Sequence, residues 1–75
     1  MKLFGLGKKQ SKLKSKWGQL QLDVRRRWGL LTDEDLQQIE GDRVMLTGRV
    51  SERYGISAEE ADRQVSDWEA NHGLA

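Results

Sequence analysis

The sequence contains no cysteine and no proline among its 75 residues, and it has a single histidine. Without cysteine the chain forms neither disulfide bonds nor thiolate metal sites. No apolar run approaches the roughly 20 residues that a membrane-spanning helix needs. Proline, which breaks helices, is absent, and this favours a helical chain. Together these absences indicate a small, soluble, intracellular helical protein.

The charge is nearly balanced over the whole chain, at +1, but it is unevenly spread. Residues 1–16 carry six lysines and no acid, whereas residues 17–75 carry seven arginines against twelve acids, a net charge of −5. We therefore expect a flexible basic arm over residues 1–16 and a folded domain over residues 17–75. A basic arm is typical of proteins with anionic partners, and the plain alternative is a solubilising terminus.

Apolar residues recur at steps of three and four, which is the spacing of one face of a helix. This period predicts an all-α fold, a small bundle of about four helices over residues 9–28, 33–40, 43–54 and 58–71. Gly41 lies between the second and third ranges. It leaves open whether these are two helices or one bent helix.

Short polar residues that can cap a helix precede three of the ranges: Thr32, Asp42 and Ser57. Glu60 is expected to reach back to Ser57 in a capping box, and Glu59 is spaced to pair with Arg63. Glycine has the freedom to form a left-handed C-terminal turn. Three glycines are placed to end helices in this way: Gly29, Gly55 and Gly73.

The helical stripes also predict the core. Trp28 and Trp68 are the largest expected contributors, since a tryptophan can bury about 150–250 Å². The full predicted core is Leu20, Val24, Trp28, Leu31, Leu36, Ile39, Leu46, Val50, Tyr54, Ala61, Val65 and Trp68.

A set of short motifs in a fixed order links this chain to a known family. The set is Trp28-Gly29, Leu31-Thr32-Asp33-x-Asp35, Ile39-x-Gly41, Leu46-x-Gly48-x-Val50, Arg53-Tyr54-Gly55, Ala61, Val65 and Trp68. In these positions the chain resembles the CsbD-like family of small bacterial stress-response proteins, over about residues 17–69. Leu22 and Asp23 stand where the family commonly has Gly-Lys.

The resemblance implies a compact all-helical domain of a bacterial cytoplasmic protein that is induced in general stress. The resemblance implies no catalytic activity and no cofactor. We expect the partners of the protein to be protein clients, whose identity is unknown. We therefore expect no enzyme, and abundance that rises under osmotic or stationary-phase stress.

The basic residues carry the second functional hypothesis, an anion-docking module. Lysines of the arm and three successive arginines would contact phosphates of nucleic acid or of an acidic membrane without reading sequence, and binding would weaken with salt. The candidate residues are Lys8, Lys9, Lys12, Lys16, Arg25, Arg26 and Arg27. Three successive helical residues fan across about 200°, so the arginines cannot form one flat patch. Asp23 is spaced to pair with Arg26 or Arg27.

Catalytic and metal chemistry find little support in the sequence. His72 lies at the end of the last predicted helix, where we expect a solvated side chain beside helix carbonyls. Glu59 and Glu60 are adjacent carboxylates, but a helix N-terminus explains them. A calcium loop that begins at Asp33 would need glycine at its sixth position, where the chain has Gln38. We therefore expect no catalytic, cofactor or metal residue.

Overall fold

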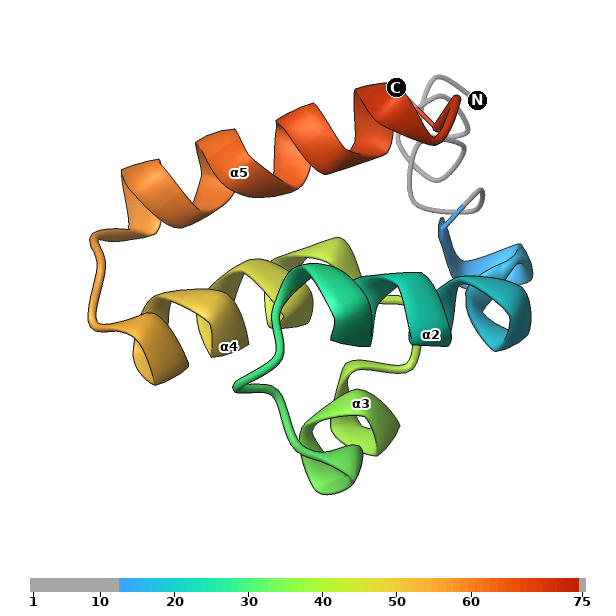
Figure 1. The fold of residues 1–75 in the computed structure, drawn as a ribbon, viewed down its shortest axis with the longest axis horizontal. Coiled ribbons are helices and arrows are strands. Elements are labelled where there is room, and N and C mark those ends of the chain that lie inside the picture. Colours follow the sequence, from blue (N-terminus) through green and yellow to red (C-terminus); the bar gives the residue numbers. More distant parts are fainter. Residues whose placement is uncertain (1–12, 75) are drawn as a thin grey trace, which may run out of the picture.

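The computed structural model describes residues 13–74, and this part of the chain is helical throughout its regular structure. Its helices are α2 (Trp17–Arg27), α3 (Asp33–Ile39), α4 (Arg43–Tyr54) and α5 (Ala58–Asn71) (Figure 1). Residues 13–15 are helical as well, ahead of a turn at Lys16. The described part thus contains five helical segments and no strand, which confirms the all-α prediction with one segment more than expected.

The predicted continuous helix over residues 9–28 is wrong in its described part, because the chain turns at Lys16; residues 9–12 lie outside the described residues. The turn lets Leu13, 1% exposed, enter the core. It also brings the backbone of Lys14 against Gly41, where an added Cβ would lie 2.6 Å from the Lys14 Cα. The break therefore follows from a contact with the distant α3–α4 loop, and the apolar period carries no signal for it.

The segment between α3 and α4 settles the alternative that the sequence left open. Glu40 has φ 47° and Gly41 has φ 79°, so two successive residues are in the left-handed region. A right-handed helix cannot continue through such a pair. α3 and α4 are therefore separate helices.

The N-terminal caps form largely as predicted. The Thr32 hydroxyl accepts from the Asp35 N–H at 3.0 Å, and the Asp35 carboxylate accepts from the Thr32 N–H at 3.0 Å, which completes a capping box. Asp42 accepts from the N–H groups of the second and third residues after it. Each cap supplies an acceptor to N–H groups that have no partner within the helix.

At the start of α5 the predicted cap at Ser57 is present, but Glu60 does not reach back to Ser57 to complete a capping box. The Ser57 hydroxyl accepts from the Glu60 N–H at 3.0 Å. The Glu60 carboxylate, however, accepts from Arg63 at 2.8 Å and from Gln64 at 3.1 Å. Arg63 therefore pairs with Glu60, three residues before it, and not with Glu59 as the spacing of four predicted.

Two of the three predicted glycine ends are confirmed. Gly55 caps α4 with φ 63°, and Gly73 follows α5 with φ 69°. Gly29 is wrong as the end of the first helix, since it is not in the left-handed region. α2 stops at Arg27, and the N–H of Trp28 closes it on the Val24 carbonyl at 2.8 Å. The chain leaves the helix at Trp28, whose side chain is completely buried.

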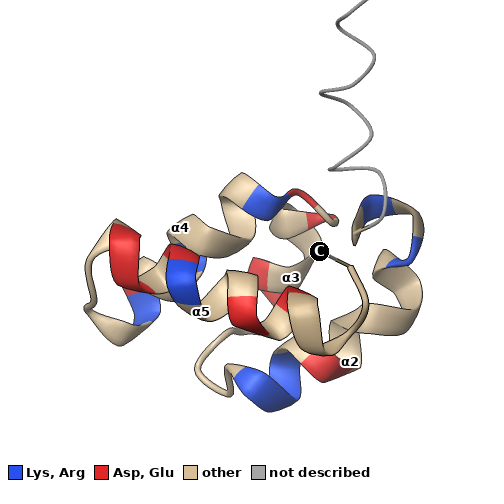
Figure 2. Ribbon diagram, turned by 90° about the horizontal axis from the view of Figure 1, so that it is seen from above, with Lys and Arg blue, Asp and Glu red and all other residues tan. Residues whose placement is uncertain are grey.

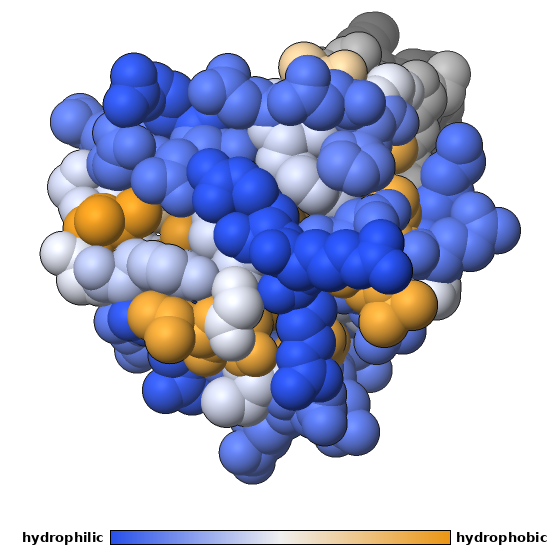
Figure 3. Space-filling model, in the orientation of Figure 1, coloured by the Kyte–Doolittle hydropathy of each residue, from blue (hydrophilic) through white to orange (hydrophobic). Residues whose placement is uncertain are grey.

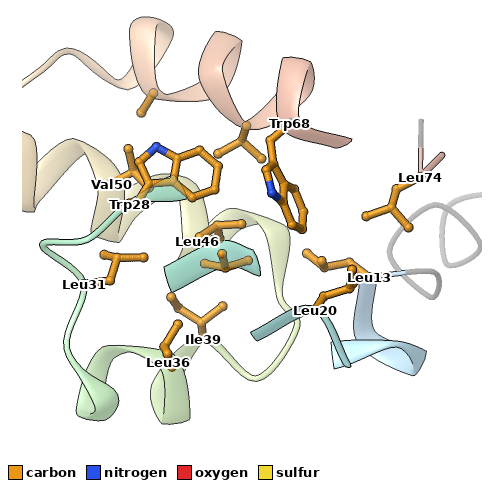
Figure 4. Close-up of a cluster of buried hydrophobic side chains, with 13 residues drawn as sticks. Leu13, Leu20, Trp28, Leu31, Leu36, Ile39, Leu46, Val50, Trp68 and Leu74 are labelled. Carbon is orange, nitrogen blue, oxygen red and sulfur yellow. The ribbon is translucent and has the colours of Figure 1, made fainter. Parts of the chain in front are cut away.

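The apolar side chains of all these segments meet in one core (Figure 4). Every predicted core residue is buried except Tyr54, which is 38% exposed. Tyr54 is the last residue of α4, and its hydroxyl accepts from the Leu30 N–H at 3.1 Å, so its polar end stays near the surface. Leu13 and Leu74 add to the core from the two ends of the described chain.

The two large aromatic residues lie side by side in this core. The ring centroids of Trp28 and Trp68 are 5.9 Å apart, with their planes tilted by 55°. The Trp28 indole N–H donates to Gln64 at 3.1 Å. The Trp68 indole N–H is buried without a hydrogen-bond acceptor.

α5 runs back along α4 in the opposite direction, and α3 lies on the other side of α2 and α4 (Figure 1). Arg43, at the start of α4, joins the two long helices. Its guanidinium donates to Asp62 at 2.6 Å, Ser66 at 2.7 Å and Glu69 at 2.9 Å, all on α5. This network holds α5 to α4 on one side and leaves a groove between α5 and α2 on the other.

Candidate functional site between α2 and α5

An open groove of about 470 Å³ runs between the C-terminal halves of α2 and α5. Its lining residues carry both signs of charge: Asp23, Arg26, Arg27, Asp67, Trp68, Asn71 and His72. The α2 and α5 stripes bury Val24 and Trp68 and so turn the neighbouring polar residues toward each other across the seam. Charged partners can therefore bind in the groove. Its two carboxylates repel a purely anionic ligand.

His72 occupies the end of this groove, just after α5. Its Nδ1 lies 2.9 Å from the Trp68 carbonyl oxygen, which confirms the predicted position beside helix carbonyls. Its side chain is 30% exposed, less than the solvated side chain that we expected. The ring stacks on Trp68 with centroids 4.5 Å apart, and Nε2 lies 3.6 Å from the Asp23 carboxylate on α2. Sequence spacing could not reveal this last contact, because α2 and α5 are far apart in the chain.

The structure separates the three successive arginines. Arg25 pairs with Asp33 at the start of α3 and points away from the groove. Arg26 lies 3.7 Å from Asp23, as the sequence predicted. Arg27 sits over the Trp28 ring at 5.0 Å and donates to Gln64 at 3.5 Å. Only Arg26 and Arg27 therefore reach the groove, as the fan of helical positions requires.

Within the described residues, no lysine of the candidate anion-binding set lies beside Arg26 and Arg27. Lys16 is exposed at the N-terminal end of α2, about 14 Å along the helix from Arg25 at 1.5 Å per residue. Figure 2 shows the basic segments as separate patches with acidic segments between them. Lys8, Lys9 and Lys12 lie outside the described residues. The anion-binding set thus stays a prediction, and the structure brings two of its seven members together.

A second polar centre, between α3 and α4, escaped the sequence reasoning. Asp35 is 2% exposed, and its two oxygens accept from Arg53 Nε at 2.8 Å and Nη2 at 2.9 Å. Arg49 Nε lies 3.9 Å from the same carboxylate. The Arg53 hydrogen bond, together with that from the Thr32 N–H, holds the pKa of Asp35 well below its usual value against the opposing effect of burial. This centre is satisfied internally, and its available chemistry is to hold α3 against α4.

The described residues offer neither a metal-binding cluster nor a membrane-spanning helix. Within residues 13–74, no group of three or more His, Asp or Glu side chains is arranged to hold a metal ion. In the same part of the chain, no helix has the length and apolar character to cross a membrane.

Comparison with curated proteins gives a consistent set of bacterial relatives. The chain is 46% identical over 56 residues to UPF0337 protein ECA0631 of Pectobacterium atrosepticum, an alignment that covers 75% of this chain and 81% of the relative. It is 43% identical over 56 residues to UPF0337 protein YjbJ of Escherichia coli K12, with the same coverage. The chain belongs to the UPF0337 family. No family model and no solved structure matches it.

UPF0337 is the CsbD-like family, so these relatives support the resemblance found in the sequence. A third relative, UPF0337 protein PA4738 of Pseudomonas aeruginosa, is 46% identical over 56 residues, which cover 86% of its length. The names of these UPF0337 proteins state no reaction, ligand or partner. They establish a small bacterial family and leave its biochemical role to be argued.

Proposed function

We propose that this UPF0337 protein is a non-enzymatic stress-response protein of the CsbD-like type that works in the bacterial cytoplasm. The observation that carries the proposal is the family membership, with 43–46% identity over 56 residues to bacterial UPF0337 proteins. The stress role itself comes from the resemblance of the motif set to CsbD-like proteins.

The use of the polar side chains supports a binding role over a chemical one. The Arg43 guanidinium donates hydrogen bonds to three side chains of α5, and the Arg53 guanidinium donates two to the buried Asp35. These groups build the fold. Hydrophilic side chains cover most of the face in Figure 3, with apolar atoms in small spots. Such a surface favours weak contacts with partners, and the groove between α2 and α5 offers one place for them.

The stress role is tested in the host bacterium with a chromosomal, epitope-tagged copy of the gene. We expect the protein to become several-fold more abundant after an osmotic upshift and on entry into stationary phase, relative to a housekeeping protein tagged in the same way. Constant abundance in both conditions would contradict the stress role. Turnover of a substrate by the purified protein, reproduced by independent preparations, would contradict the non-enzymatic part.

One observation favours a second candidate function, docking on anionic polymers or membranes. The Arg26 side chain is 77% exposed at the edge of the groove, with Arg27 next to it. Exposed guanidinium groups bind phosphate without sequence readout, and their contribution falls as salt rises. The lysine-rich start of the chain would add to this attraction.

The docking function is tested with the full chain by titration with duplex DNA and with vesicles of anionic lipid, at low and at physiological salt. Two variants separate the contributions: Arg26→Gln with Arg27→Gln, and the four lysines Lys8, Lys9, Lys12 and Lys16 changed to Gln. The control is Arg63→Gln, which removes one exposed cation from the far part of α5. Salt-sensitive binding that both variants weaken and the control retains would support docking; equal binding by all four proteins would contradict it.

A further inference from the structure

The outer face of α2 carries an exposed leucine between two arginines. Leu22 is 66% exposed and lies opposite the side of the helix on which Leu20 and Val24 enter the core. Arg25 and Arg26 follow three and four residues later, so they lie one turn from Leu22, on either side of it. The core therefore does not use Leu22, and its apolar surface is open to a partner that approaches between the two guanidinium groups.

No described helix covers this face. Gly18 lies one turn before Leu22 and Gly29 just beyond the helix end, and an added Cβ at either glycine would meet nothing within 4 Å. Gln19, next to Gly18, is exposed as well. α2 lies at the front of the molecule in Figure 1, and Figure 3 shows that side with hydrophobic atoms in separate spots between strongly hydrophilic ones. Leu30, which is 56% exposed, adds an apolar side chain beyond the C-terminal end of the helix.

The charge of the chain is divided between the segment around α2 and the rest of the domain. Residues 13–30 carry five cations against one acid, a net charge of +4, whereas residues 31–75 carry four arginines against eleven acids, a net charge of −7. Residues 1–12 add four lysines ahead of α2 in the chain. In the field of an anionic surface such a division orients the protein with α2 toward the surface and the acidic segments away from it.

The exposed leucine distinguishes between the anionic partners that the docking function allows. A nucleic acid presents phosphates to the arginines, but its phosphate backbone offers no apolar surface on which to bury Leu22. A membrane presents anionic headgroups beside acyl chains, so it binds cations and an apolar side chain together. Two separate leucines bury too little area for a stable protein interface, which needs about 800 Å² on each partner. These features favour an anionic lipid surface.

We propose that the outer face of α2 docks on an anionic membrane surface. Leu22 inserts between the headgroups, and Arg25 and Arg26 contact the lipid phosphates on either side of it. Arg26 lies 3.7 Å from Asp23 but keeps its side chain 77% exposed. Arg25 is 48% exposed and paired with Asp33, so it contributes less. This mode of docking rests on the docking function proposed above, and its partner is the lipid surface, which α2 contacts without crossing.

The first experiment measures the binding of the full chain, by co-sedimentation, to vesicles of phosphatidylglycerol and phosphatidylcholine in equal parts. Leu22→Gln should lower the partition coefficient about five- to tenfold, because it removes the inserted apolar side chain. Arg26→Gln should lower it about fivefold, the contribution of one cation near an anionic surface. The matched control is Val44→Gln, which should leave the coefficient unchanged. Val44 is 69% exposed, but it lies at the start of α4, where its N–H donates to Asp42.

The absence of cysteine allows a second measurement that does not depend on how much residues 1–12 add to the affinity. Leu22→Cys and Val44→Cys each provide a single site for an environment-sensitive fluorophore. On the anionic vesicles the label at position 22 should shift its emission to shorter wavelength and be quenched by spin-labelled lipid. The label at position 44 should retain the emission that it has in buffer.

The outcomes separate this mode of docking from the docking function itself. Binding to the vesicles with the same emission change at positions 22 and 44, or with no loss of binding in Leu22→Gln, would overturn the role of α2 and leave the docking function standing. Binding to duplex DNA but not to the vesicles would overturn it in favour of a nucleic-acid partner. Binding to neither would contradict the docking function as well.

Discussion

Asp35→Asn tests whether the buried ionic centre stabilises the domain. The substitution keeps the shape of the side chain and removes its charge, so the two Arg53 contacts at 2.8 and 2.9 Å lose their ionic character. Breaking a fully buried ion pair costs about 3–5 kcal/mol. The Arg53 side chain is 44% exposed and can regain water, which lowers the expected cost to about 2–3 kcal/mol. A domain of this size has a net stability of only about 3–5 kcal/mol.

The assay is urea unfolding followed by far-UV circular dichroism at neutral pH. Glu34→Gln is the control, because it removes one acidic charge from the same first turn of α3 and leaves the hydrogen bonds between Asp35 and Arg53 in place. We expect the control to cost less than about 1 kcal/mol, the size of an exposed charge–dipole interaction. Arg53→Met should cost more than Asp35→Asn, since it leaves an ionised carboxylate buried without its main partner. An Asp35→Asn cost no larger than that of Glu34→Gln would refute the reasoning.

The same centre predicts how stability depends on acid. The pKa of Asp35 is depressed in the folded protein, chiefly by the Arg53 hydrogen bond. A depressed pKa contributes stability that is fully present above the unfolded value of about 4 and is lost as the pH falls below it. The free energy of unfolding of the wild type should therefore decrease below about pH 4. In Asp35→Asn this decrease should be smaller, and a parallel decrease in both proteins would count against the assignment.

Further substitutions test the packing, each by thermal and urea unfolding. Gly41→Ala should destabilise by about 2 kcal/mol or more, because φ is 79° and a Cβ would lie 2.6 Å from a backbone carbon; a neutral result would show that the N-terminal turn does not pack there. Gly48→Ala should instead stabilise the domain by about 0.5–1 kcal/mol, because Gly48 lies inside α4 and an added Cβ would meet open space. Trp28→Ala and Trp68→Ala should each cost about 3–5 kcal/mol, and an unchanged melting curve would refute burial. Trp28→Phe should cost more than Trp68→Phe, because only Trp28 donates a hydrogen bond from its indole; the reverse order would contradict this account.

Residues 32–71 show how far local patterns reach. The caps at Thr32, Asp42 and Ser57 and the turn at Gly55 join atoms only a few residues apart, so residue type and spacing suffice to predict them. Tyr54 shows where the apolar period predicts burial wrongly. It lies in register with the apolar stripe of α4, but at the end of the helix, where its hydroxyl accepts a hydrogen bond from the Leu30 N–H near the surface.

The candidate groove was predictable only in part. The local pair between Asp23 and Arg26 followed from their spacing on one helix. The approach of His72 to Asp23 joins residues 49 positions apart, and no pattern of a single helix contains it. The pairing of Arg25 with Asp33 likewise joins α2 to α3, and the spacing within one helix did not predict it.

By itself, the sequence determined the helices after residue 32, their caps, the apolar core stripe and the family, because each depends on residue types at short spacing or in a fixed order. The tertiary structure alone decided the turn at Lys16, the burial of Asp35 beside Arg53, and the meeting of α2 and α5 at His72. Each of these depends on contact between segments that the chain holds far apart. Packing of the shared core brings them together, and only then do their charges and hydrogen bonds act on one another.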